Sequence, residues 1–529
     1  MKSKETKKDG ILSGIIGGTL SLTLSAVIVK FIGLIYKIPI ASLLGDEGMG
    51  YFNSAYTVYA FFYLLCTAGV PKAVMILISE AKARGREIEE RKILKVASLL
   101  FLSVGVVATA LFVIFSAPIA NLIGNNKSYF TMLAIAPSII LVSLSGVLRG
   151  YLSANTRLLD IAVSQIIEGV GKLALGLLFA MIGKRLELPL EMLSAMTILG
   201  VTFGALLGLV YLLICSQTKI PKENIGQNSE SVKTLPITKR ILSISIPITL
   251  SAAIMSLTNI IDLGLIMRSL VKIGYSESIA SALYGNYTTL AVPMLNLAMS
   301  VISPISIAFL PIFTRCLVAS DTDGLLKTEK TSLELTAMLG APMMIGLIIY
   351  SREILSMLFP TSEIETGAAL LCLISPAIFF SSILLIINTL LEACGRVRIP
   401  LISMGIGSII KILASHFLIT KTDMGILGAP ISTVLSYACA LLISTLIYGR
   451  VLKKHIPIFE SCVTPHLNAF IAVILSRIVY DRLIFQLDKT PTLIISILLA
   501  ALIYLGISAF CGLIGPKKIG ELAKYTNFS

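Results

Sequence analysis

Several ionisable side chains of this sequence lie inside long apolar runs, where a charge needs a partner or a water-filled cavity. The basic ones are Lys30, Lys37, Lys72, Lys172, Lys411 and Arg477, and the clear acidic ones are Glu168 and Asp262. A charge at the centre of a membrane-spanning helix costs at least about 2.5–3.5 kcal/mol. A cavity lined by these groups is basic overall. It suits phosphate, pyrophosphate or carboxylate, with lysine as a point-charge partner.

Spacing separates these groups into different interpretations. Lys30 and Lys37 are seven residues apart, so they share one helix face two turns apart, and we expect them to line the cavity. Glu168 and Lys172 are four residues apart, so a purely structural pair on one helix face is an equal alternative to a role in the cavity.

The remaining groups divide between structural and functional interpretations. Snorkelling from a kinked helix explains Lys72, which follows Pro71, and a position near the membrane interface explains Arg477. Asp262 lies one turn after Asn259, which gives its helix a polar face and indicates a role in the cavity or in coupling to a cation.

The composition requires a membrane protein. Of the 529 residues, 56% are apolar and 14% are charged, whereas soluble domains have about 45–50% and about 25%. At about 20 residues per span, this apolar supply fills roughly 14 helices. Fourteen apolar runs are found, at 11–40, 51–79, 93–117, 129–148, 161–182, 192–215, 241–263, 281–313, 333–350, 365–391, 399–419, 426–448, 465–485 and 491–515.

The basic residues alternate with these runs. With the N-terminus in the cytoplasm, 28 of the 43 Lys and Arg fall in cytoplasmic segments and 9 in outward loops. This bias predicts fourteen helices with both termini in the cytoplasm. It also explains the net charge of +14 without nucleic acid as a partner. The run after the basic N-terminal tail is interpreted as the first span rather than a cleaved leader.

A polar linker predicts two lobes. Residues 216–240, SQTKIPKENIGQNSESVKTLPITKR, are charged and rich in Ser, Asn and Pro. We therefore expect an N-lobe of six helices over 1–215, a C-lobe of six helices over 241–450, and a helix pair with a tail over 451–529. The predicted fold class is an all-α polytopic membrane protein with two pseudo-symmetric lobes.

An internal repeat supports this division. At an offset of 233, Tyr51 and Asn53 align with Tyr284 and Asn286, and at 239 Lys172 aligns with Lys411. Parallel six-helix halves place a substrate site between them, near the membrane middle. Symmetric lysines favour such a site. The two asparagines fit either ligand contact or hydrogen bonding between helices.

No catalytic constellation is found. The string GVGKL, 169–173, lacks the distant Gly and the Ser or Thr of a nucleotide-binding loop. The eight cysteines form no C-x-x-C pair, and three scattered histidines do not make a zinc site. We therefore expect no enzyme, no metal and no cofactor. The glycines of GIIGG (14–18) and GALLG (204–208) indicate close helix packing.

Two longer strings carry a family resemblance. KFIGLIYKIPIASLLGDEGMGYF, 30–52, resembles the start of the polysaccharide-flippase branch of the multidrug/oligosaccharidyl-lipid/polysaccharide (MOP) exporter superfamily. LRGYLSANTRLLDIAVSQIIEGVGK, 148–172, resembles that branch's R-G-Y-x-Q-G…P-T-A-x-S-Q-x-x-E signature. Arg149-Gly150-Tyr151, Ser164-Gln165 and Glu168 match it, whereas Ser153-Ala154 and Asp160 depart from it. Within the branch, the chain is most similar to the stage V sporulation protein B group, which is related to MurJ-type lipid II flippases.

The resemblance implies export of a lipid-linked glycan by alternating access. In the MurJ-type relatives, arginines of the first helices line a cationic cavity for the pyrophosphate. Lys30 falls at one such position and Lys37 is close to another. The relatives' last two helices form a lipid-facing groove for the polyprenyl tail, which implies this role for 465–515.

These observations predict a flippase for an undecaprenyl-pyrophosphate-linked peptidoglycan precursor, in cell-wall or spore-cortex synthesis. The expected cavity residues are Lys30, Lys37, Lys172, Lys411, Arg149, Asn53 and Asn286. Asp262 and Glu168 are the expected acids for coupling to Na+ or H+. The other expected partners are membrane lipids, and a monomer in the bacterial cytoplasmic membrane is the default. The alternatives are an exporter of another lipid-linked polysaccharide unit, an ion-coupled multidrug exporter, and a membrane scaffold for envelope synthesis.

Overall fold

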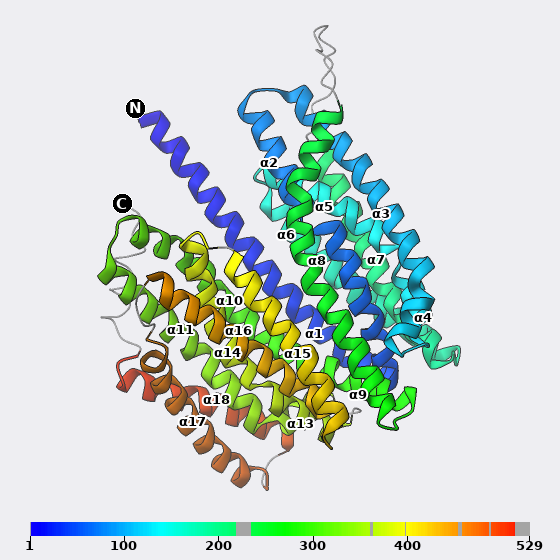
Figure 1. Cartoon of the computed structure of the whole chain (residues 1–529), viewed down its shortest axis with the longest axis vertical. Coiled ribbons are helices and arrows are strands. Elements are labelled where there is room, and N and C mark those ends of the chain that lie inside the picture. The colour runs from blue at the N-terminus through cyan, green and yellow to red at the C-terminus, as the bar shows by residue number, and fades with distance from the viewer. Residues whose placement is uncertain are drawn as a thin grey trace. The chain divides into compact units, whose positions relative to one another are not determined.

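The computed structural model describes residues 2–217, 234–359, 363–396, 398–452, 457–485 and 488–513. Within these ranges, the side chains of 2–27, 30, 31, 34, 217, 251, 254, 255 and 452 are outside the description. The described chain is helical and contains no strand (Figure 1).

Twelve helices of the described part are long and apolar enough to cross a membrane, so the chain is a multi-pass membrane protein. They confirm twelve of the predicted runs; for example, the run at 161–182 lies in the span Leu158–Arg185. The run at 11–40 falls mostly on side chains outside the description, and the run at 241–263 lies in the helix Thr234–Lys272. The total of fourteen spans therefore stays a prediction.

Contacts divide the chain into two compact units. Unit 1 is Met1–Val271 with Tyr275–Gly285, and unit 2 is Lys272–Gly274 with Asn286–Ser529. The predicted lobe boundaries stay a prediction, and most of the expected linker, 218–233, lies outside the described residues. The helices of unit 1, of which the last two end just beyond it, are α1 (Lys2–Thr67), α2 (Val70–Ala83), α3 (Glu87–Ile123), α4 (Ser128–Ile135), α5 (Ser138–Ala154), α6 (Leu158–Arg185), α7 (Leu190–Gln217), α8 (Thr234–Lys272) and α9 (Glu277–Asn286).

A kink at Gly45 divides α1 into two legs. Gly45 has φ 64° and ψ −178°, a conformation that glycine adopts without the steric cost of a Cβ atom. The two legs contact each other across the kink, because the rings of Tyr36 and Phe52 lie 6.2 Å apart between their centroids. The kink therefore brings residues from both legs of α1 to one place.

Helices α6 and α7 pack closely through glycines. A Cβ atom on Gly204 would lie 2.7 Å from the backbone oxygen of Glu168 and from the backbone nitrogen of Lys172. One on Gly208 would lie 3.2 Å from the Cβ of Glu168. The predicted role of the 204–208 glycines in close packing is confirmed. This packing fixes the helix that carries Glu168 and Lys172 against its neighbour.

Helix α8 lies against α2 and α3 within unit 1. Its residues Ile237 and Ile241 belong to the same buried cluster as Val74 and Leu77 of α2 and Ile93 of α3. This apolar cluster forms the core of unit 1 at one end of these helices.

The helices of unit 2 enclose a second core. They are η1 (Tyr287–Ala291, a π-helix), α10 (Val292–Val318), α11 (Thr322–Ile349), α12 (Ser351–Leu358), α13 (Ile364–Ile374), α14 (Pro376–Ala393), α15 (Arg398–Lys421), η2 (Gly425–Leu427, a 3₁₀ turn), α16 (Gly428–Leu452), α17 (Ile458–Leu483) and α18 (Lys489–Phe510). Buried side chains of α10, α11, α14 and α16 form the core.

The last two helices pack on α11. The hydroxyl of Tyr504 on α18 donates to the backbone oxygen of Met338 at 3.0 Å. Arg477 of α17 forms ion pairs with Glu353 at 2.6 Å and Asp481 at 3.1 Å. The structural interpretation of Arg477 is therefore supported, since two carboxylates balance its charge.

Candidate functional site

Three basic side chains and one carboxylate gather in unit 1, on α1, α5 and α6. We name this set the basic cluster: Lys37, Arg149, Glu168 and Lys172. All four side chains are partly exposed. The charges of Lys37 and Lys172 lie close enough to interact with each other. Four of the sequence-predicted site residues are therefore brought together in one unit.

Arg149 and Glu168 join α5 to α6. The Arg149 Nη2 atom donates to Glu168 Oε2 at 2.7 Å, and their side chains are 13% and 28% exposed. The pair links the R-G-Y part of the sequence signature to its distal glutamate. The alternative pairing of Glu168 with Lys172 on one helix face is not formed, because Glu168 binds the guanidinium of Arg149 instead. Lys172 therefore pairs with no carboxylate in the part of the chain that the structure describes.

Tyrosine rings hold Lys172. Its Nζ atom lies 4.7 Å from the ring centroid of Tyr56 and 5.1 Å from that of Tyr36. A cation over an aromatic face gains about 0.5–1 kcal/mol at exposed sites and about 2 kcal/mol where it is desolvated. The rings stabilise the ammonium without neutralising it. Lys172 is therefore a candidate partner for an anion.

The two tyrosines belong to a column of aromatic rings along α1. Successive centroids in the column Tyr36, Phe52, Tyr56, Tyr59 and Tyr63 lie 5.7–6.4 Å apart. Tyr63 interacts with Arg149, and both Tyr59 and Tyr63 interact with Glu168. The column therefore lies beside Arg149, Glu168 and Lys172. The fourth member of the basic cluster, Lys37, directly follows Tyr36 in the sequence.

Sequence reasoning missed this column. Tyrosine counts as an apolar residue in the search for spans, so the rings merged with the runs at 11–40 and 51–79. The spacing of Tyr56, Tyr59 and Tyr63 is the signal that could have found part of it, since steps of three and four share one helix face.

The other predicted residues of unit 1 lie elsewhere or outside the description. The side chain of Lys30 is outside the described part, so its place in the cavity stays a prediction. Asn53 is buried on the second leg of α1, and Asp262 is buried on α8; each is 5% exposed. Lys72 is exposed in the first turn of α2, as expected for a snorkelling side chain.

Unit 2 holds the two predicted residues of the second repeat. Asn286 is 1% exposed at the start of the π-helix η1, and its Nδ2 atom makes no hydrogen bond to any described residue. The next residue, Tyr287, shares a hydrogen bond of 3.0 Å with Thr433 of α16. Lys411 is partly exposed on α15. Short π-helices occur frequently at functional sites, and this one adjoins the buried asparagine.

Two buried carboxylates of unit 2 were also missed. Glu329 and Glu334 on α11 are 3% and 7% exposed. The hydroxyl of Tyr448 on α16 donates a hydrogen bond to the carboxylate of Glu329. They were overlooked because one lies just before an apolar run and the other inside it. A buried carboxylate requires a hydrogen-bonded or charged partner, and Tyr448 supplies one.

The fold and the family define the class of this protein. The structure is similar to the solved structure of the lipid II flippase MurJ in an inward closed conformation, with a TM-score of 0.67 and 16% identity over 92% of this chain and 98% of that one. A family model described as "Polysaccharide biosynthesis protein" matches residues 15–317, and the MatE model matches 286–416. The protein is therefore a membrane protein of the MOP exporter superfamily.

Within that superfamily, the chain belongs to the polysaccharide biosynthesis protein family. Two relatives from Bacillus subtilis (strain 168) are similar over most of their length. Stage V sporulation protein B is 24% identical over 83% of this chain and 84% of that protein. Lipid II flippase MurJ is 23% identical over 84% of this chain and 83% of that protein.

Proposed function

We propose that the protein is a flippase that carries an undecaprenyl-pyrophosphate-linked peptidoglycan precursor, such as lipid II, across the cytoplasmic membrane by alternating access. The observation that carries this proposal is the position of Lys172, which two tyrosine rings hold and which pairs with no carboxylate among the described residues. The similarity to stage V sporulation protein B and to lipid II flippase MurJ supports this class of cargo.

The basic cluster would bind the pyrophosphate. Lys172 and Lys37 would contact its oxygens as point charges, because an ammonium donates in several directions without a fixed fork. Arg149 would act mainly on Glu168, since its guanidinium is already engaged there. Lys30 on the same helix as Lys37 would extend the basic face, and Asn53 would supply a further hydrogen-bonding group.

The two predicted lobes, 1–215 and 241–450, would rock against each other, with Asn286 and Lys411 as the contribution of the second lobe to the cavity. Many large apolar side chains of α17 and α18 are exposed, including Phe470 and Leu502, and would contact the polyprenyl tail.

Energy would come from the membrane potential or from a Na+ or H+ gradient. Asp262 and Glu168 would be the coupling acids. Both termini would be cytoplasmic and the protein a monomer.

Binding by the purified protein tests the proposal. Native mass spectrometry with lipid II, with a second undecaprenyl-linked glycan and with a cationic dye would compare the unmodified protein with Lys37→Met/Lys172→Met. Lys184→Met is the matched control, because Lys184 lies exposed on the same helix as Lys172. We expect lipid II to bind preferentially, the double variant to lose this binding, and the control to retain it.

Each other outcome favours a different cargo. Equal binding of the two glycans would favour the exporter of another lipid-linked polysaccharide unit, in line with the description of the matching family model. Binding of the dye alone would favour a multidrug exporter, for which the buried Glu329 and Glu334 and the MatE match are the supporting observations. Lipid II binding that is unchanged in the double variant would refute the assignment of the basic cluster.

A further inference from the structure

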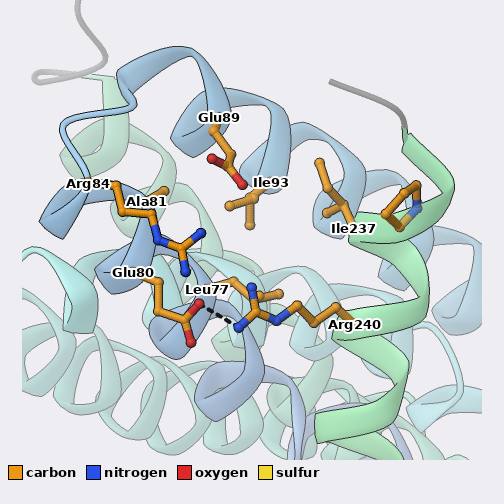
Figure 2. A pocket seen from close by; sticks show the side chains of 9 residues that line it. Leu77, Glu80, Ala81, Arg84, Glu89, Ile93, Ile237 and Arg240 are labelled. Atoms are coloured by element: carbon orange, nitrogen blue, oxygen red, sulfur yellow. Dashed lines mark ion pairs between the residues drawn. The ribbon is translucent and has the colours of Figure 1, made fainter. Parts of the chain in front are cut away.

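A second site lies in unit 1, away from the basic cluster. A pocket of about 170 Å³ opens where α2 ends and where α3 and α8 begin (Figure 2). Its charged lining residues are Glu80, Arg84, Glu89 and Arg240. Apolar side chains form the rest of the lining: Leu77, Ala81, Ile93, Pro236 and Ile237. The pocket therefore combines charged groups with an apolar wall.

The two carboxylates of the pocket already have partners. Glu80 pairs with Arg240 at 2.6 Å, and Glu89 pairs with Arg86, which does not line the pocket, at 3.3 Å. Arg84 makes no ion pair in the described part of the chain. In Figure 2, its guanidinium extends toward the same space as the Glu80–Arg240 pair. The pocket therefore offers one uncompensated guanidinium beside a second one.

The pocket lies where two candidate membrane spans meet. One candidate span ends at Ala83 and the next begins at Glu87, so Arg84 lies in the turn between them. Two large apolar residues next in sequence to lining residues are exposed, namely Ile88 at 57% and Leu235 at 64%. Exposed apolar groups next to basic ones at this level are suited to the border between acyl chains and headgroups.

The size of the pocket limits its ligand. Sites for drug-sized molecules usually measure about 300–1,000 Å³. At about 170 Å³, this pocket is too small for a glycan-linked cargo and large enough for one headgroup. Basic pockets between membrane helices bind anionic lipid headgroups, and arginine binds a phosphate in bidentate geometry.

We propose that this pocket binds the phosphate group of an anionic phospholipid. Arg84 is the principal partner of the phosphate, Arg240 is the second, and the exposed Ile88 and Leu235 contact the acyl chains. The bound lipid would join α2, α3 and α8 at this boundary. The proposal does not depend on the cargo of the basic cluster, because no residue is shared between the two sites.

Native mass spectrometry of the full chain in detergent tests this site. Phosphatidylglycerol is the probe, phosphatidylcholine with the same acyl chains is the zwitterionic reference, and glycerol 3-phosphate is the soluble competitor. One basic residue near an anionic lipid contributes roughly 1 kcal/mol to binding, which corresponds to about a fivefold change in Kd. We therefore expect Arg84→Ala to weaken phosphatidylglycerol binding by about fivefold or more. Lys95→Ala is the control, because Lys95 is an exposed basic residue of α3 that does not line the pocket.

Three outcomes would overturn the proposal. An equal loss of binding in Arg84→Ala and Lys95→Ala would show general surface charge, and no loss in Arg84→Ala would show that the pocket does not hold the lipid. Displacement of the lipid by glycerol 3-phosphate at equal concentration would identify a soluble phosphate instead. If Arg84→Ala fails to fold, Arg84→Lys decides, since it keeps the charge but loses bidentate contact and should bind more weakly than the unmodified protein.

Discussion

The ion pair between Arg149 and Glu168 gives a prediction whose size follows from its geometry. One charge-assisted hydrogen bond of 2.7 Å joins the two side chains, which are 13% and 28% exposed. Hydrogen bonds to charged groups contribute about 1.5–3 kcal/mol in soluble proteins. Interhelical hydrogen bonds in membranes average about 0.6 kcal/mol and reach about 1.7 kcal/mol. We therefore expect a coupling free energy of about 1–2 kcal/mol.

A double-mutant cycle measures this coupling. Arg149→Met and Glu168→Gln each leave the other group without its partner. The two single losses in free energy of unfolding should therefore add up to more than the loss in the double variant. Unfolding in mixed detergent and SDS micelles, followed by the helical circular dichroism signal, gives the four free energies. The pair Arg86–Glu89, three residues apart on the chain and 62% and 22% exposed, is the control cycle, with an expected coupling below about 0.5 kcal/mol. A coupling for Arg149 and Glu168 no larger than that of the control would refute the view that this pair fastens α5 to α6.

Further substitutions test the helix packing and the ring column. Gly204→Ala should destabilise the protein by about 1–3 kcal/mol in thermal unfolding, because its Cβ would overlap the backbone of α6. Gly405→Ala, with nothing within 4 Å, should cause no loss, and similar effects of the two would contradict the packing argument. Gly45→Ala should cost about 1–2 kcal/mol in the same assay, since alanine is strained at φ 64°, and an unchanged melting temperature would count against the kink. Tyr56→Leu should weaken lipid II binding about two- to fivefold by removing a ring from Lys172, whereas Tyr56→Phe should keep it; equal binding by both would exclude the cation–π contribution.

The spans could be predicted from the sequence because a membrane requires long apolar runs, and twelve of the fourteen runs are confirmed. The ends of helices were less accurate. The run at 129–148 ended before Arg149, whereas α5 continues to Ala154 and places this arginine inside a candidate span. A polar residue ends a hydropathy run, but an ion pair with a neighbouring helix allows the helix to continue.

The basic cluster could be predicted only in part. Lys37 and Lys172 were found because a charge in an apolar run is rare and costly. Their environment could not be found, because it depends on which helices are neighbours. Arg149 and Glu168 are 19 residues apart on different helices, so local spacing favoured Lys172 as the partner of Glu168. The rings that hold Lys172 come from α1, on both sides of the kink at Gly45.

Transport of lipid II in proteoliposomes tests the central claim most directly. Purified protein would be reconstituted with lipid II, and headgroup exposure would be followed with a membrane-impermeant reagent under an imposed membrane potential. The account predicts lipid II translocation by the unmodified protein and by Lys184→Met, and its loss in Lys37→Met/Lys172→Met at equal reconstituted amounts. Full translocation by the double variant would contradict the claim that the basic cluster carries the pyrophosphate.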